Sequence, residues 1–318
     1  MSSTPMGYLA AALGAGAALG SAATFLGGQS QPRRELPKRS NTYSARGHRD
    51  RDQSESSYSS PWQSSRAAHT TSMAYGSDSR RAELRRIAEE TLTVLREGFY
   101  SYKGVDHDLR PSLKESHKGT KYYAPQSSVK DWKQEKASKG SGKTYLSILN
   151  ISAIDAARLL STTTLRLGEK HAKVGLLNFA SATLPGGGFQ TGAEAQEESI
   201  ARSSTLYDSL VSDEAKEFYR LHEKESAQSS AAFYSHGIIY SPSVTVFRDD
   251  DGVWTYPFNI DVLSCAAVNA GEARKRSSAG QGLEVVIERE MMERMGRILY
   301  VFEKAGVRNL VLGTFGTG

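Results

Sequence analysis

The hydrophobic positions of this chain become periodic only after about residue 80. A helix is predicted to begin at Asp78 or Ser79, either of which can cap it, and to end at Gly98. Its apolar residues recur at helical spacing: Leu84, Ile87, Ala88, Leu92 and Leu95. Later patterns predict strands at 144–150, 173–180, 237–247, 261–268 and 309–313, and helices at 153–161 and 283–304. This alternation predicts a three-layer α/β/α sandwich with a mixed sheet, whose strand ends offer loops to a ligand.

The chain before residue 80 lacks this pattern. Residues 29–79 are rich in Gln, Ser, Arg, Asp and Gly, with hardly any aliphatic side chain. Such a composition cannot bury enough apolar surface to offset the entropy lost on ordering. We therefore expect a disordered leader over residues 1–79 and one folded domain over residues 80–318.

An apolar, Gly/Ala-rich segment lies inside this leader. Residues 7–28 carry no charge, are about long enough to cross a bilayer, and precede a basic cluster at residues 33–39. However, Ala and Gly dominate, and no basic residue precedes the segment as a secretory signal requires. Two interpretations stay open: a weak membrane anchor with a cytosolic basic flank, or a loosely helical leader.

The net charge of +5 suggests a nucleic-acid partner until it is divided along the chain. Residues 1–80 hold nine Lys and Arg against five Asp and Glu, which leaves 31 against 30 in the remaining residues. The folded part is nearly neutral, so we expect no direct DNA binding.

The cysteine and histidine residues of the sequence give little support for a catalytic thiol or a metal site. The single cysteine, Cys265, excludes a disulfide framework and lies in an apolar run without a neighbouring histidine, which predicts a buried, inert thiol. The histidines lack ligand spacing, so we expect no metal or redox cofactor. Residues 249–251, three aspartates before a glycine, are typical of a hairpin turn.

The stretch after the predicted strand 173–180 carries the chemistry: SATLPGGGFQTGAEAQEESIARSSTLYDSL. Three glycines, Gly186, Gly187 and Gly188, permit a ligand to approach bare backbone, and the helix that follows directs its N-terminal amides to the same place. A plain flexible turn is the alternative.

That helix begins with Gln196, Glu197 and Glu198. Adjacent helix positions differ by about 100°, so the two glutamates cannot both point at one reacting atom. In a glycosidic site one glutamate would move the proton, which fits a single acid/base better than two carboxylates about 5 to 5.5 Å apart. Two glutamates that merely stabilise the helix dipole are the alternative.

The spacing of three glycines, seven residues and QEE resembles the signature of poly(ADP-ribose) glycohydrolases, and the wider text resembles their microbial, bacterial-type branch. Similar stretches include RRIAEETLTVLREGFY, IYSPSVTVFRDDDG, AAVNAGEA and RNLVLGTFGTG, so the resemblance covers about residues 80–318. It implies a macrodomain-like fold with a helical N-terminal addition.

The resemblance also implies roles for individual residues. Glu198 would be the general acid/base, and Glu197 would contact the terminal ribose. The three glycines would wrap the distal ribose and a phosphate, and Asn178 and Ser181 would lie on the ribose side. The remaining residues implied to line the substrate site are Gln196, Asn269, Gly313, Phe315, Gly316 and Gly318; for Asn269, ligand contact and a turn-holding role are both open.

The last of these residues match the first half of a second glycine-rich loop that grips the diphosphate in the family. Relatives continue beyond it, whereas this chain stops at Gly318, and Thr317 stands where they have cysteine. The sequence therefore looks truncated, which puts full diphosphate binding in doubt.

We thus expect a hydrolase that cleaves the ribose–ribose O-glycosidic bond of poly(ADP-ribose) and releases ADP-ribose. An ADP-ribose-binding module or a catalytically impaired fragment is the alternative. The expected partner is poly(ADP-ribose) or an ADP-ribosylated protein, and a monomer in the cytoplasm or nucleus is expected. Whether the substrate is the polymer or a single ADP-ribose stays open.

Overall fold

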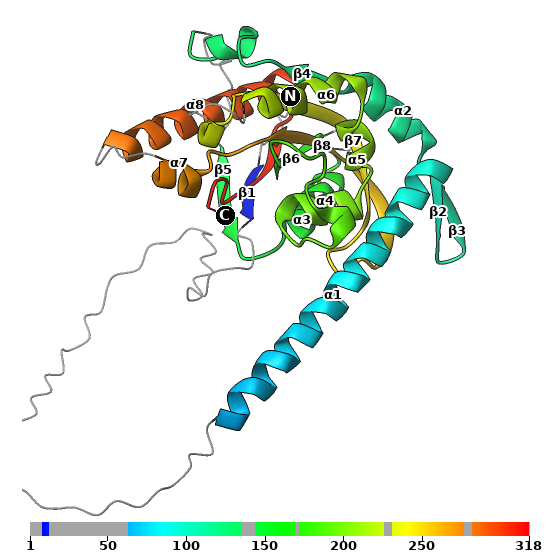
Figure 1. Cartoon of the computed structure of the whole chain (residues 1–318). Coiled ribbons are helices and arrows are strands. Elements are labelled where there is room, and N and C mark those ends of the chain that lie inside the picture. The colour runs from blue at the N-terminus through cyan, green and yellow to red at the C-terminus, as the bar shows by residue number, and fades with distance from the viewer. Residues whose placement is uncertain are drawn as a thin grey trace, which may run out of the picture. The chain divides into compact units, whose positions relative to one another are not determined.

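A seven-stranded mixed sheet forms the centre of the computed structural model, which describes residues 8–12, 63–134, 144–169, 172–225, 231–276 and 282–317 (Figure 1). The strand order is β4 (Lys121–Tyr123), β7 (Ile238–Arg248), β8 (Trp254–Cys265), β6 (Val174–Phe179), β9 (Asn309–Gly313), β1 (Tyr8–Ala12) and β5 (Tyr145–Leu149). The five strands from β8 to β5 are parallel, while β7 and β4 add antiparallel pairs. The chain divides into two units, residues 1–17 with 78–318 and residues 18–77, and the sheet belongs to the first.

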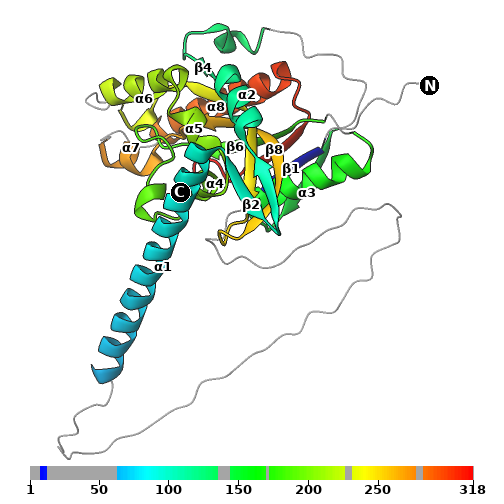
Figure 2. The ribbon, with the colours of Figure 1, turned by 90° about the vertical axis from the view of Figure 1, so that its right-hand side faces the viewer.

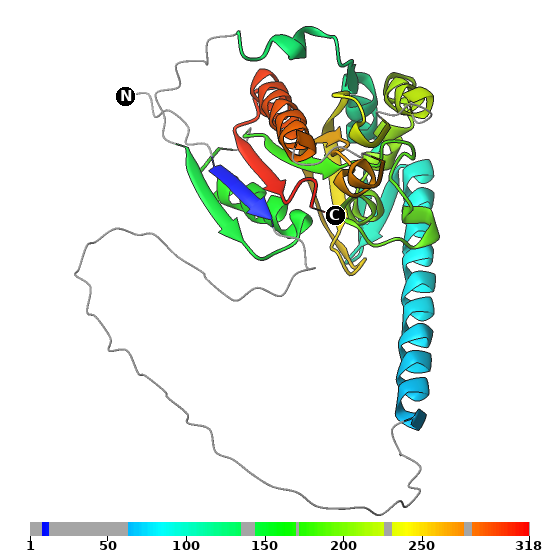
Figure 3. The same ribbon diagram turned by 60° about the vertical axis from the view of Figure 1, so that its left-hand side comes forward.

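Helices cover both faces of this sheet, as the sequence predicts. Figure 3 shows α8 (Gly282–Lys304) on one face and α3 (Ala153–Arg166) on the other. The period-two alternation of β6 explains the layering: Leu176 packs in the core on the α3 side, and Leu177 packs with α8. The other helices are α1 (Gln63–Glu97), α2 (Arg110–Gly119), α4 (Gln196–Ser203), α5 (Leu206–Leu210), α6 (Asp213–Glu225) and α7 (Ala270–Arg276).

The segment between α1 and β5 supports the antiparallel side of the sheet. A hairpin of β2 (Phe99–Tyr102) and β3 (Val105–Asp108) follows α1, and the hairpin and α2 lie over the β7–β8 pair (Figure 2). Short 3-10 turns at Ser128–Asp131, Phe189–Thr191 and Ala231–Phe233 complete the description. None of these elements was predicted from the sequence.

The predicted end of α1 is confirmed, and its predicted start is not. Gly98 adopts a φ of +74° and its N–H donates to Val94 O at 2.8 Å, which closes the helix. The helix already begins at Gln63, upstream of the predicted caps. Within the compact unit its buried side is built from Leu84, Ile87 and Ala88, as the periodicity indicates.

The predicted strand 261–268 is wrong at both ends, since β8 starts at Trp254 and stops at Cys265. Its first half alternates between exposed and half-buried side chains, so it has no apolar run. The Asp249–Gly252 turn that joins β7 to β8 is confirmed: Gly252 N–H donates to Asp249 O at 3.1 Å, and Asp249 N–H donates to Val253 O at 3.0 Å.

Two parts of the predicted leader lie among the described residues. Tyr8–Ala12 forms β1, which pairs with β9 on one side and β5 on the other, and residues 63–79 belong to α1. Neither element was expected. The rest of the apolar segment 7–28 lies outside the described residues, and the domain boundary near residue 80 stays a prediction. No helix in the described ranges is long and apolar enough to span a bilayer.

Candidate functional site

Three segments that are distant in sequence meet at the carboxyl ends of the parallel strands. The loops after β6, β8 and β9 leave the same edge of the sheet, where ligands bind in open α/β folds. The rings of Phe179 and Phe315 are 5.6 Å apart between centroids, and a Cβ on Gly316 would lie 3.5 Å from that of Ala267. The structure therefore brings the glycine-rich loop after β9 against the end of β6 and the loop after β8.

Gln196 attaches the start of α4 to the sheet. Its Oε1 accepts from Phe179 N–H and its Nε2 donates to Leu177 O, both at 2.8 Å. The β6–β9 pairing covers only Val174 to Leu176, so the glutamine side chain takes the place of a ladder partner beyond that point. Gln196 thereby positions the two glutamates that follow it, and its contact with substrate stays a prediction.

Glu197 is buried and both of its oxygens are engaged. Oε1 accepts from Asn178 Nδ2 at 3.2 Å, and Oε2 accepts from Ser181 N–H at 2.7 Å. Burial raises the pKa of Glu197 to about 8, and the neighbouring Glu198 adds to the shift while both hydrogen bonds oppose it. Burial therefore favours the protonated form of this carboxyl group.

Glu198 points to a different partner, as the angle between adjacent helix positions predicts. Its Oε1 accepts from Gly188 N–H at 2.9 Å. Its Oε2 is buried and has no hydrogen-bond partner among the described residues. A buried oxygen without a partner is uncommon in proteins and is available to a ligand.

The glycine loop lies against these carboxylates. Gly186 and Gly187 have φ values of +70° and +57°. A Cβ on Gly187 would lie 2.3 Å from Glu198 Oε1 and 3.1 Å from Glu197 Oε2, so no side chain fits there. The loop is therefore built for close approach of backbone to the acid groups, and a plain flexible turn does not explain its geometry.

Two predicted ribose-side residues border Glu197. Asn178 is fully buried; its Nδ2 also donates to Ser264 Oγ at 2.9 Å, while its Oδ1 has no partner in the described ranges. Ser181 Oγ accepts from Leu184 N–H at 3.2 Å and so shapes the loop that leads to the glycines. Both residues hold Glu197, and their direct contact with a ribose stays a prediction.

The geometry around Asn269 favours the turn-holding role. Its Oδ1 accepts from Glu272 N–H at 2.9 Å, which caps α7, and its own N–H donates to Ala232 O at 2.8 Å. Gly313 ends β9, and Gly316 adopts a φ of +86°. Gly318 lies outside the described residues.

Sequence reasoning missed the support that α1 gives to the site and a buried tyrosine of α6 near it. Thr91 Oγ1 of α1 donates to Arg202 O of α4 at 2.6 Å, and the buried Arg202 guanidinium donates to Ala193 O at 2.5 Å. The hydroxyl of Tyr219 on α6 is buried without a partner among the described residues, and burial together with Glu197 raises its pKa well above its usual value. No local pattern indicates the contacts of Thr91 and Arg202 or the burial of Tyr219, because all of them depend on the fold.

Neither the thiol nor a metal cluster contributes to this site. Cys265 is fully buried, so the prediction of a buried thiol is confirmed, and this burial raises its pKa to about 11. Within the described ranges, no three His, Cys, Asp or Glu side chains are grouped to hold a metal ion.

A cavity of about 770 Å³ opens at the other edge of the sheet, near the amino end of β6. A six-residue strand separates it from the glutamates by about 20 Å. Four acidic residues line it, Asp108, Glu115, Glu169 and Asp261, against the single cation Lys173. This charge disfavours a nucleotide-like anion, so the cavity is distinct from the candidate site.

Comparison with known proteins agrees with this geometry. The model of the microbial-type PARG (poly(ADP-ribose) glycohydrolase) catalytic domain matches residues 88–249. The crystal structure of a poly(ADP-ribose) glycohydrolase from Thermomonospora curvata is 33% identical, with a TM-score of 0.65 over 76% of this chain and 81% of that one. A Deinococcus radiodurans poly(ADP-ribose) glycohydrolase in complex with ADP-ribose is 34% identical, with a TM-score of 0.54 over 65% and 78% of the two chains. No curated protein sequence matches the chain.

Proposed function

Because the chain belongs to the microbial-type poly(ADP-ribose) glycohydrolase family and is a glycohydrolase, we propose that it cleaves the ribose–ribose O-glycosidic bond of poly(ADP-ribose) with Glu198 as the only acid/base. The observation that carries this proposal is the free Glu198 Oε2, which faces no protein partner in the described ranges. Glu197 has no free oxygen, since Asn178 and Ser181 occupy both.

The reaction balances with one carboxyl group. Glu198 gives its proton to the bridging oxygen as the bond from that oxygen to the anomeric carbon breaks, which leaves an oxocarbenium-like ribose and a free hydroxyl on the other product. Water then adds to the anomeric carbon and returns its proton to Glu198. ADP-ribose is released, and the carboxyl group is restored.

The neighbouring groups would hold the sugar rather than exchange protons with the leaving group. A protonated Glu197 can donate to a ribose hydroxyl, in keeping with its raised pKa. The amides of the glycine loop and of the first turn of α4 supply positive potential beside the reacting bond, where a phosphate or developing charge is stabilised. The ADP-ribose complex of the Deinococcus relative supports this class of ligand.

The test is a turnover assay with poly(ADP-ribose) on Glu198→Gln and Glu197→Gln. Glutamine at position 198 keeps the acceptor for Gly188 N–H but cannot move a proton, so we expect turnover to fall by about 10²- to 10⁴-fold. Glu197→Gln should weaken ADP-ribose binding and reduce turnover less. Circular dichroism checks that both variants fold.

Calorimetry with ADP-ribose separates the enzyme from a binding module. A wild-type protein that binds ADP-ribose and does not release it from the polymer would be a reader of this ligand, and the proposal would be wrong. Unchanged turnover in Glu198→Gln would equally contradict the assignment of the acid/base.

A further inference from the structure

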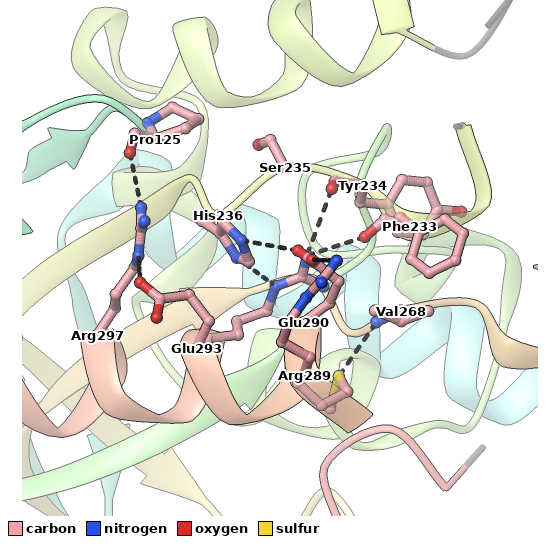
Figure 4. A network of polar contacts seen from close by, with 12 residues as sticks. Pro125, Phe233, Tyr234, Ser235, His236, Val268, Arg289, Glu290, Glu293 and Arg297 are labelled. Carbon is pink, nitrogen blue, oxygen red and sulfur yellow. Dashed lines mark hydrogen bonds and ion pairs between the residues drawn. The ribbon is translucent and has the colours of Figure 1, made fainter. Parts of the chain in front are cut away.

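Arg294 of α8 is a buried cation outside the acid site. It has no exposed surface, and no carboxylate of the described residues forms an ion pair with it. Its guanidinium donates instead to three backbone carbonyls: Ala266 O at 2.8 Å, Phe233 O at 2.9 Å and Tyr234 O at 3.3 Å. Figure 4 labels the last two of these acceptor residues. Burying a charge is costly unless its partners are well placed, so the position of these carbonyls is closely defined.

His236 completes the set of acceptors. Arg294 Nε approaches His236 Nδ1 at 3.4 Å, and His236 Nε2 lies 3.1 Å from Glu290 Oε2. Burial, with help from Arg294 and Arg297, lowers the pKa of His236 to about 4, against the opposing effect of Glu290 and Glu293. At neutral pH the ring is therefore neutral, with Nδ1 as the acceptor and Nε2–H directed at Glu290.

The three carbonyls belong to two loops that Arg294 joins. One loop, residues 231–236, leads into β7, and the other, residues 266–269, leaves β8. Further contacts tie the second loop in place: Asn269 N–H donates to Ala232 O, and Val268 N–H lies 3.4 Å from Met291 Sδ of α8. Tyr234 has a φ of +52°, a strained conformation for a tyrosine that its surroundings must hold.

The loop after β8 borders the candidate site on two sides. Cys265 O, next to the carbonyl that Arg294 holds, accepts from Ala180 N–H at 3.0 Å, and the following residue Ser181 donates to Glu197. On the other side, Ala267 lies against Gly316 of the loop after β9. The 266–269 loop thus contacts the loop after β9 and continues from a strand end that is hydrogen-bonded to the start of the loop after β6.

We propose that Arg294 is a positioning residue that fixes the 266–269 loop as a wall of the ADP-ribose pocket, by holding it to the 231–236 loop. The proposal rests on the proposed function for the identity of the ligand. Arg294 touches no substrate itself, because its guanidinium is fully enclosed. Its effect should therefore appear in ligand affinity more than in the proton-transfer step.

Arg297 provides a matched control one turn along the same helix. It is also buried, pairs with Glu293 Oε1 at 3.0 Å and donates to a backbone carbonyl, Pro125 O, at 2.6 Å (Figure 4). That carbonyl belongs to the segment before β5 rather than to either loop. Arg297→Lys therefore also removes a buried guanidinium group, but it leaves the contacts of the 231–236 and 266–269 loops unchanged.

The experiment compares Arg294→Lys and Arg297→Lys with the wild type. Lysine keeps the charge but cannot reach all three carbonyls at once, so folding is retained while the loops loosen. We expect Arg294→Lys to weaken ADP-ribose binding in calorimetry roughly tenfold or more, with a similar rise in KM and a much smaller change in kcat. Hydrogen exchange should quicken in peptides covering 231–236 and 266–269, and Arg297→Lys should change neither binding nor exchange there.

Equal ADP-ribose affinity for the two variants, or exchange that quickens evenly over the protein, would overturn the positioning role. A wild-type protein that fails to bind ADP-ribose would instead overturn the proposed function. Hydrogen exchange tests the role of Arg294 even then. If exchange in the 231–236 and 266–269 peptides is as slow in Arg294→Lys as in the wild type, Arg294 does not hold the loops, whether or not the proposed function is right.

Discussion

Gly187 is a glycine for two physical reasons, its backbone conformation and the lack of space for a side chain. Its φ of +57° disfavours any L side chain, and its backbone lies so close to the Glu198 carboxylate that a Cβ would overlap Oε1. We predict that Gly187→Ala displaces Glu198 and lowers turnover by about 10²-fold, because small misplacements of a catalytic group have effects of this size. Steady-state kinetics with poly(ADP-ribose) measure it.

Gly306→Ala is the control for backbone strain alone. Gly306 has a φ of +74°, and nothing lies within 4 Å of the position of its Cβ. Both variants should lose about 1 kcal/mol of stability to the left-handed conformation, and Gly187→Ala should lose more because its Cβ overlaps Glu198. Only Gly187→Ala should lose activity. Equal turnover in the two variants would show that the contact with Glu198 is unimportant.

At this scale the sequence predicted the different directions of the two glutamates and missed their hydrogen-bond partners. The divergence of Glu197 and Glu198 follows from helix geometry, which requires no tertiary information. The donors to Glu197, Asn178 Nδ2 and Ser181 N–H, depend on where α4 packs against β6. Gln196 fixes this position by hydrogen bonds to the backbone of β6, which no sequence motif reveals. The raised pKa of Glu197 likewise comes from burial, which only the folded chain creates.

Among the elements, α1 matters to the site through a close backbone contact. A Cβ on Gly192, whose φ is +80°, would lie 2.6 Å from Arg81 O of α1. We predict that Gly192→Ala pushes α1 away from the loop and lowers the free energy of unfolding by more than about 2 kcal/mol, the sum of strain and overpacking. Urea denaturation measures the loss.

Gly168→Ala separates these two contributions. Gly168 has nearly the same φ, +81°, and open space at its Cβ position, so its substitution should cost only about 1 kcal/mol. If both variants lose the same stability, the contact between α1 and the loop carries no energy. A further loss of turnover in Gly192→Ala would indicate that α1 also orders the glycine loop.

Elements with a continuous apolar run were predictable, and those that obtain their partners from the fold were not. β6 was found because it is buried on both faces, and β9 because its apolar side chains are all buried or half-buried. The first half of β8 was missed because its side chains are mostly half-exposed, and β1 because a five-residue strand inside an Ala-rich segment has no distinguishing pattern. The two hairpin strands have four residues each and α2 is polar, so no periodic apolar pattern distinguishes these elements from a loop.

For the molecule as a whole, the near-neutral charge of residues 81–318 needs an explanation, since the proposed substrate is a polyanion. The candidate site offers the N-terminus of α4 and glycine backbone in place of a lysine-rich surface. Backbone amides recognise a phosphate or sugar oxygen by geometry and attract other polyanions less. A nearly neutral enzyme of this kind can therefore discriminate against nucleic acids, which bind chiefly through charge.

The protonation of Glu197 also links the site to the stability of the whole molecule. Its pKa is about 8 in the folded state and near 4.5 when exposed, so between these values the native protein holds one proton more than the unfolded chain at this position. The free energy of unfolding therefore falls as the pH rises through this range, and the full cost is present above pH 8. We predict that Glu197→Gln removes this slope and becomes more stable relative to wild type by on the order of 4 kcal/mol between pH 5 and 8. Urea denaturation at several pH values measures the difference, with the substitution of an exposed glutamate, Glu214→Gln, as control. If the free energies of unfolding of Glu197→Gln and wild type differ by the same amount at every pH, Glu197 is ionised in the native protein.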